Sequence, residues 1–147
     1  MVIAVDFDGT IVENKYPEIG REQPFAIETL KMLVAERHRL ILWTCREGKL
    51  LEEALQWCRD RGLEFYAANR DYPEETTDNN PHFTRKLKAD LFIDDRNVGG
   101  MPDWGTIYRM VSHGKKWHHI IEEAYSGQMD YTGTGRSHRQ KKHWWQF

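Results

Sequence analysis

Short apolar runs alternate with amphipathic segments along most of the chain. Residues 2–5 form an apolar, largely β-branched run, which is typical of a strand buried on both faces. Residues 40–43 and 89–93 are further runs of this kind, and residues 63–68 form a weaker one. The pattern therefore predicts four strands.

Between these runs, apolar residues recur at the spacing of helices. Pro24 can open a helix, and Ile27, Leu30 and Val34 follow it at helical spacing. The other stripes are Leu51, Ala54, Leu55 and Cys58; Trp104, Ile107, Tyr108 and Val111; and Trp117, Ile120, Ile121 and Ala124. Asp103 precedes the third stripe and is a plausible N-cap. We therefore expect four helices.

The order strand, helix, strand, helix, strand, loop, strand, helix, helix predicts an α/β fold. Parallel neighbours need crossover connections, which are right-handed almost without exception. We expect a doubly wound three-layer sandwich with a mostly parallel sheet of four or five strands. Two segments show neither the periodicity of a strand nor that of a helix and are predicted to be loops: residues 11–22 and 69–84.

Composition and charge fit one soluble domain. The chain has 147 residues, of which 39% are hydrophobic and 30% charged, and its net charge of −2 predicts no partner. We assign residues 1–126 to the domain and residues 127–147, which are basic and aromatic without a period, to a tail. No run reaches the roughly 18 apolar residues of a membrane span, and no export signal is visible. We expect a cytoplasmic protein with no membrane partner.

Acidic residues follow the first and fourth predicted strands. Asp6 and Asp8 leave the same strand two residues apart, so their side chains start on the same side, and Gly9 permits a sharp turn beside a bound phosphate. Two close carboxylates are not comfortably ionised together without a positive partner. Asp94 and Asp95 supply further oxygen ligands, and a set of oxygen ligands suits Mg²⁺ better than zinc. The sequence therefore predicts a magnesium site.

Phosphoryl transfer to an aspartate also requires donors for the phosphate oxygens. Thr44 follows the second predicted strand and offers a hydroxyl donor. Lys86 or Lys88, shortly before the fourth strand, could neutralise a phosphate oxygen. The sequence thus contains a candidate for every group that this reaction needs.

These residues resemble the four motifs of the haloacid dehalogenase-like (HAD) superfamily of phosphatases. The motifs are Val-Asp6-Phe-Asp8-Gly9-Thr10, Leu-Ile-Leu-Trp-Thr44, a lysine, and Leu-Phe-Ile-Asp94-Asp95. The resemblance spans residues 1–112, and its first motif is the most specific. Within this superfamily the chain resembles the small capless type, because neither predicted loop is long enough to build a cap domain.

The resemblance implies a phosphomonoester hydrolase. It implies that Asp6 is the nucleophile that becomes aspartyl-phosphate and that Asp8 is the general acid and base. It also implies that Mg²⁺ is held by the Asp6 carboxylate, the Asp8 main-chain carbonyl and Asp94. Thr44 and a lysine would contact the phosphate, and we prefer Lys86 because it lies nearer the helix start that the resemblance implies.

Other residues near the strand ends could join the site. The additional candidates are Asp95, Lys88, Arg46, Gly9 and Thr10. Arg96 and Asn69 also follow predicted strands, but we expect each to be a solvated loop residue. The resemblance further implies that residues 11–22 form a mobile flap beside the nucleophile. We expect a small phosphorylated metabolite as substrate, and a homo-oligomer stays open because a neighbouring subunit could supply pocket walls.

Two alternative functions remain. A phospho-acceptor signalling domain of the receiver kind also stores phosphate on an aspartate, although the strand-two and strand-three ends here, Thr44 and Asn69, are not acidic. Residues 136–145 mix Arg, Lys and His with Trp144 and Trp145, as in proteins that bind single-stranded nucleic acid. A nucleic-acid-associated phosphatase that uses this tail is the second alternative.

Overall fold

The computed structural model describes residues 1–83, 86–114, 118–119 and 122. Residues 1–113 form one compact unit, and the fold and site below belong to it. The predicted helix at residues 117–124 falls mostly outside the described residues, and the predicted tail and its boundary after residue 126 fall wholly outside them.

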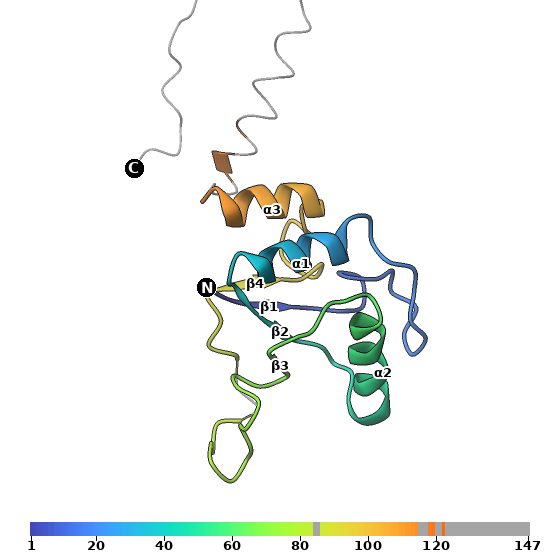
Figure 1. The fold of residues 1–147 in the computed structure, drawn as a ribbon, viewed down its shortest axis with the longest axis vertical. Coiled ribbons are helices and arrows are strands. Elements are labelled where there is room, and N and C mark those ends of the chain that lie inside the picture. Colours follow the sequence, from blue (N-terminus) through green and yellow to red (C-terminus); the bar gives the residue numbers. More distant parts are fainter. Residues whose placement is uncertain (84–85, 115–117, 120–121, 123–147) are drawn as a thin grey trace, which may run out of the picture. The chain divides into compact units, whose positions relative to one another are not determined.

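Four parallel strands form the sheet of this unit (Figure 1). They are β1 (Val2–Val5), β2 (Arg39–Leu42), β3 (Ala67–Ala68) and β4 (Leu91–Ile93), in the spatial order β3-β2-β1-β4. Val5, the last residue of β1, pairs with Leu42 on one side and with Ile93 on the other. The predicted α/β class with a parallel sheet is confirmed, and the ends of these three strands meet at one edge of the sheet.

One face of the sheet is covered by helices. They are α1 (Ala26–Ala35), α2 (Gly48–Arg59) and α3 (Trp104–Ser112). Ile3 and Leu40, which are register partners in the sheet, are buried in one core with residues from all three helices. Helices α1 and α3 lie side by side, and Glu36 after α1 accepts a hydrogen bond of 2.6 Å from the Tyr108 hydroxyl of α3 (Figure 1).

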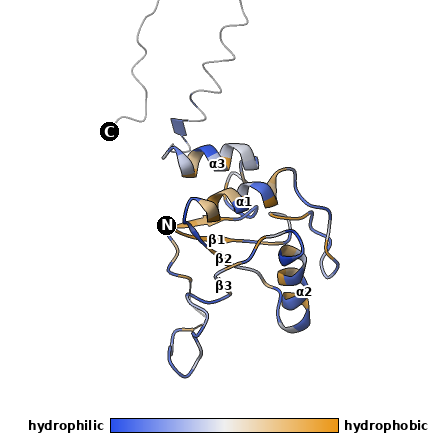
Figure 2. Ribbon diagram, in the orientation of Figure 1, coloured by the Kyte–Doolittle hydropathy of each residue, from blue (hydrophilic) through white to orange (hydrophobic). Residues whose placement is uncertain are grey.

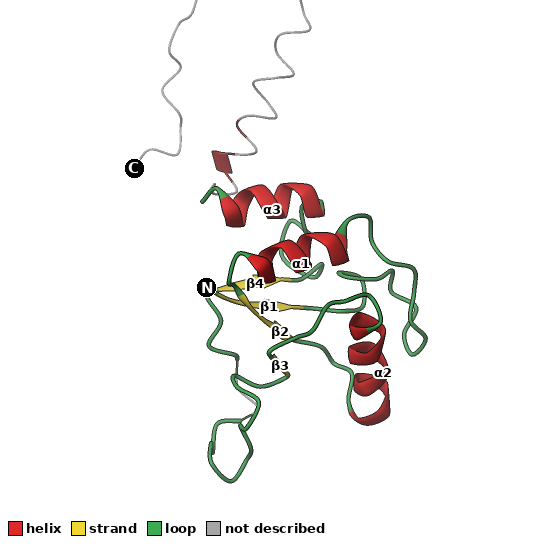
Figure 3. Ribbon diagram, in the orientation of Figure 1, coloured by secondary structure: helices red, strands yellow, loops and turns green. Residues whose placement is uncertain are grey.

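The opposite face is covered by the connection between β3 and β4. From β1 the chain steps outward to β2 and β3 and then crosses back past β1 to β4. A right-handed crossover in that reversed direction places the connection on the second face. Leu87 packs there against Ala4 and Ile41. Figure 3 shows this connection as a long loop. The layer on the second face of the sheet is therefore a loop, where a regular three-layer sandwich has a helix.

The amphipathic pattern located the helices well but not every buried position. Leu30 is buried as predicted, whereas Val34 is 42% exposed and Leu33 takes the next core position, so the prediction for Val34 is wrong. Asp103 caps α3 as predicted, because its side chain accepts the amide N–H of Thr106 at 3.0 Å. Figure 2 shows the apolar β1 strand beside helices of mixed hydropathy. Within the described residues, none of the helices is long and apolar enough to cross a membrane.

Replacing Leu30 with alanine should destabilise the domain strongly. Leu30 is fully buried, so its truncation leaves a cavity and should lower the free energy of unfolding by about 2 to 5 kcal/mol. Met32→Ala on the same helix, at a position that is 42% exposed, should cost about 0.5 kcal/mol or less. Urea denaturation of both variants measures the difference, and equal costs would contradict the assigned helix face.

Candidate functional site

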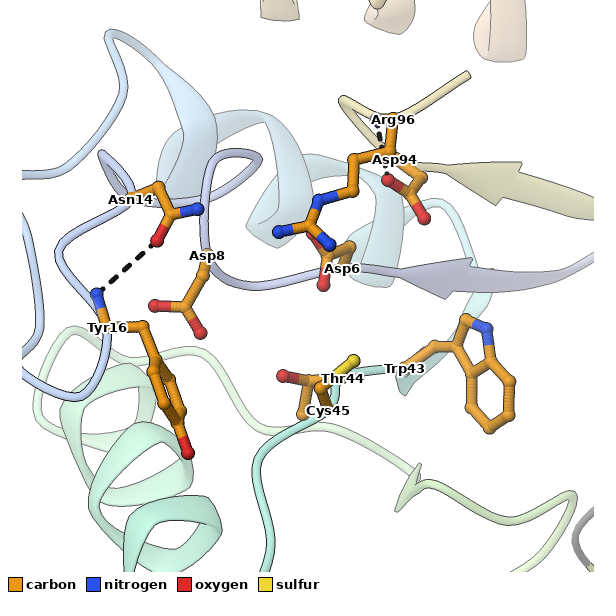
Figure 4. A pocket seen from close by; sticks show the side chains of 9 residues that line it. All are labelled: Asp6, Asp8, Asn14, Tyr16, Trp43, Thr44, Cys45, Asp94 and Arg96. Carbon is orange, nitrogen blue, oxygen red and sulfur yellow. Dashed lines mark hydrogen bonds between the residues drawn. The ribbon is translucent and has the colours of Figure 1, made fainter. Parts of the chain in front are cut away.

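A pocket of about 560 Å³ opens at the carboxyl edge of the sheet (Figure 4). Its lining residues come from the ends of β1, β2 and β4 and from the segment after β1. They are Asp6, Asp8, Asn14, Tyr16, Trp43, Thr44, Cys45, Asp94 and Arg96. The parallel sheet thus brings together most of the polar residues that the sequence placed at strand ends.

Three carboxylates crowd at the junction of β1 and β4. Asp6, Asp94 and Asp95 each offer an oxygen, and these oxygens lie within 4.8 Å of one another. The two strands are neighbours, and the amide of Asp6 donates a 2.9 Å hydrogen bond to the carbonyl of Ile93. Carboxylate oxygens are the ligands that Mg²⁺ and Ca²⁺ prefer, so this cluster could hold a divalent cation.

Thr10 and Gly9 hold this cluster together. Thr10 is buried, and its Oγ1 lies 3.2 Å from Asp6 Oδ2 and 3.3 Å from Asp95 Oδ1. The same oxygen accepts the Asp95 amide N–H at 3.0 Å, and Trp104 Nε1 donates to the Thr10 carbonyl at 3.1 Å. Gly9 has φ +92°, and a Cβ there would collide with the Asp95 carboxylate. Both residues therefore shape the cluster.

The cluster has an excess of negative charge. The pKa of Asp6 is raised from 3.8 to about 7, mainly by burial and to a smaller extent by the nearby Asp94 and Asp95 carboxylates. Hydrogen bonds from the Phe7 amide and the Thr10 hydroxyl offset part of this rise. A cation beside Asp6 would favour the ionised form, because it cancels the repulsion that the neighbouring acids exert.

The Asp8 carboxylate points away from the cluster and binds Arg46. Arg46 Nε donates to Asp8 Oδ2 and Nη2 donates to Asp8 Oδ1, both at 2.7 Å. This ion pair raises the pKa of Arg46, whose side chain is fully buried. Arg46 was a candidate for substrate contact, but in the structure it binds protein groups behind the pocket wall. The Asp8 side chain is likewise outside the set of three that could share a cation.

Thr44 lies at the pocket wall and is held by its neighbours. Its hydroxyl oxygen accepts the Arg46 amide N–H at 3.2 Å, which leaves the hydroxyl proton available to donate. Asn69, at the end of β3, accepts the Thr44 amide N–H at 2.8 Å and donates to the Arg46 carbonyl at 3.2 Å. Asn69 is thus half-buried and fixes the loop after β2, contrary to the expectation of a solvated residue.

The predicted lysines lie outside the pocket lining. Lys86 Nζ lies 4.8 Å from the centroid of the Phe92 ring, and Lys88 is exposed. The cation that does line the pocket, among the described residues, is Arg96. Figure 4 shows its guanidinium extending toward Asp6. Arg96 was expected to be a solvated loop residue, and it is exposed, but it also lines the pocket. Its place directly after the two acidic residues of the fourth strand was the available signal for a role in the site.

Fold and site together define an α/β protein with an acidic pocket at the carboxyl edge of a parallel sheet. No family model matches the chain, and no curated protein matches it. A solved structure does: it is described as a conserved protein from Bacteroides thetaiotaomicron, is 68% identical to this chain and superposes with a TM-score of 0.76. The match covers 82% of this chain and 96% of that one. The chain therefore belongs to the same family as this conserved protein.

Asp6→Asn should stabilise the fold at neutral and alkaline pH when divalent cations are chelated. Between pH 3.8 and about 7 the folded state retains a proton on Asp6 that the unfolded chain releases, so the wild type loses stability as pH rises through this window. The variant has no carboxylate to ionise and should gain about 1 to 2 kcal/mol at about pH 8, a value discounted for partial exposure.

Thermal or urea unfolding across this pH range measures the gain. The exposed Asp60→Asn is the matched control and should follow the wild type. Adding Mg²⁺ should stabilise the wild type above pH 7 more than the Asp6→Asn variant. An Asp6→Asn curve parallel to that of the wild type would contradict the assigned charge crowding.

Proposed function

We propose that this protein is a magnesium-dependent phosphomonoester hydrolase that acts through an aspartyl-phosphate on Asp6. The observation that supports it best is the convergence of the three carboxylates of Asp6, Asp94 and Asp95 within 4.8 Å beside a pocket. Asp8 and Thr44 line the same pocket and supply the proton-transfer group and the hydroxyl donor that the reaction needs.

Asp6, Asp94 and Asp95 are the residues that would hold Mg²⁺. When bound, the ion would neutralise charge on the phosphate oxygens and on the crowded carboxylates. Their oxygen-only chemistry fits this ion. The sequence predicted Asp94 as a metal ligand and gave Asp95 only as an additional candidate. The short distance between their oxygens favours both as ligands.

The reaction has two steps on this chain's own residues. An Asp6 oxygen attacks phosphorus in line and the bond from phosphorus to the ester oxygen breaks. In this step Asp8 is protonated on one oxygen while the other still accepts from Arg46, and it gives that proton to the ester oxygen. Asp8 then takes a proton from a water molecule that attacks the aspartyl-phosphate, which releases inorganic phosphate and the Asp6 carboxylate. Thr44 and Arg96 stabilise the negative charge on the transferring phosphoryl group by hydrogen bonding.

The geometry favours this function over a phospho-acceptor signalling domain. A receiver domain has an acidic pair after its first strand and accepts phosphate on an aspartate after a different, middle strand of its sheet. Here the ends of β2 and β3 carry Thr44 and Asn69, which are hydrogen-bonded to each other. The tail on which the nucleic-acid alternative depends lies outside the described residues, and a small phosphorylated metabolite is the substrate that a pocket of about 560 Å³ suits best.

The wild type should hydrolyse p-nitrophenyl phosphate only with Mg²⁺ present. Asp6→Asn should lower kcat by at least about 10³-fold, because the amide is not a nucleophile for this step. Asp60→Asn, at an exposed carboxylate on the end of α2, should keep the activity of the wild type. Turnover that survives in Asp6→Asn, or that chelation does not affect, would refute the mechanism. A long-lived phosphoprotein without turnover would favour the signalling function instead.

Arg96→Ala should lower kcat/KM about 100-fold, since it removes the cation that lines the pocket beside the phosphate site. Lys86→Ala should change kcat/KM little, because Lys86 lies on the Phe92 ring. Steady-state kinetics of the two variants decide which of the two residues stabilises the phosphate. A large loss in Lys86→Ala with none in Arg96→Ala would restore the role that the sequence analysis gave to the lysine.

A further inference from the structure

We propose that Arg46 is a positioning residue that couples the flap, residues 11–22, to Asp8. The inference rests on the proposed function, because it concerns the group that transfers the proton. Its basis is that one buried side chain binds both the Asp8 carboxylate and the backbone of the flap. The pocket wall that the flap provides and the orientation of Asp8 are therefore set together.

Arg46 uses most of its hydrogen-bonding capacity on these two partners. Besides the bidentate pair with Asp8, Nη1 donates to the Pro17 carbonyl at 3.0 Å and Nη2 donates to the Glu18 carbonyl at 2.9 Å. Four hydrogen bonds thus extend from a guanidinium that has five N–H donors. Such a pattern fixes the planar group in one orientation, since each bond has its own direction.

Aromatic rings hold the same guanidinium from the core and from the flap. Arg46 Cζ lies 5.2 Å from the centroid of the Phe7 ring and 5.4 Å from that of the Tyr16 ring. Phe7 is buried and contacts Trp57 of α2 edge to face, with the ring centroids 5.8 Å apart. Arg46 is therefore anchored to the rigid core on one side and contacts the flap on the other.

Flap residues next to those that Arg46 binds line the pocket. Asn14 and Tyr16 line the pocket, and Asn14 Oδ1 accepts the Tyr16 amide N–H at 3.4 Å (Figure 4). The base of the flap is joined to itself by backbone hydrogen bonds, such as that from the Glu13 amide to the Arg21 carbonyl at 2.7 Å. A displacement of the flap tip would carry Arg46 with it or break its bonds to the Pro17 and Glu18 carbonyls, and either event would loosen the orientation in which Arg46 holds Asp8.

Lysine cannot replace Arg46 in this role. A lysine offers a single ammonium group, whereas Asp8 and the two flap carbonyls need donors that are spread over a planar fork. Arg46→Lys keeps the positive charge for Asp8 but cannot satisfy all these acceptors. This variant therefore separates charge from positioning, and Arg46→Ala removes both.

The kinetic test compares two leaving groups. A nitrophenolate departs with little need of a proton, whereas an alkoxide needs general acid catalysis by Asp8. In Arg46→Lys and Arg46→Ala, kcat/KM should fall at least about 10-fold more for an alkyl phosphate than for p-nitrophenyl phosphate. Arg21→Ala removes an exposed arginine–carboxylate pair at the base of the same flap and should leave both rates unchanged. Equal losses on both esters would overturn the positioning role and leave Arg46 as a structural residue.

A second readout does not need turnover. Hydrogen exchange of the flap amides should be faster than in the wild type in both Arg46→Lys and Asp8→Asn, since either change weakens the link between Asp8 and the flap. Flap exchange that Asp8→Asn leaves unchanged would refute the coupling. If the wild type hydrolysed neither ester, the proposed function would fail. Hydrogen exchange of the flap amides in Asp8→Asn would still decide whether Arg46 couples Asp8 to the flap.

Discussion

The crowding of negative charge where β1 meets β4 is the constraint on which the site depends. Because the two strands are parallel and in register through Val5 and Ile93, the residues that follow them emerge side by side. Asp6, Asp94 and Asp95 are then forced together, and their repulsion opposes folding. The buried strands supply the hydrophobic stabilisation that makes such a cluster tolerable.

Asp8, the second acidic residue after β1, has its negative charge balanced by a positive one. Asp8 is only two residues from Asp6, yet it has a full positive partner in Arg46. The Asp6 cluster contains acidic groups in excess, whereas the pair of Asp8 with Arg46 is neutral as a whole. A cation that enters the pocket therefore gains most electrostatic energy at the cluster and least beside Asp8. In the proposed mechanism, this difference separates the place for a metal ion from the place for proton transfer.

The sequence predicted those features that backbone position alone determines. Short apolar runs marked the strands, and the acids directly after them had to lie at the sheet edge. The destinations of long side chains were not predictable in this way. Arg46 follows β2 near the site and is drawn inward by Asp8, whereas Lys86 precedes β4 and lies across Phe92. Such choices depend on partners from distant parts of the chain, which local periodicity does not contain.

The strand order also divides the pocket edge into two chemically different halves. The central β1 and the edge strand β4 end in carboxylates, whereas β2 and β3 end in Thr44 and Asn69. Asn69 holds the loop after β2 by accepting the amide N–H of Thr44, so this half presents the neutral Thr44 hydroxyl in a fixed position. In the proposed mechanism, a phosphate bound over Asp6 would lie at the border of the halves, with some oxygens facing a cation and others facing the Thr44 hydroxyl. This asymmetry suits a phosphoryl group that must be both neutralised and oriented, because charge alone does not fix its direction.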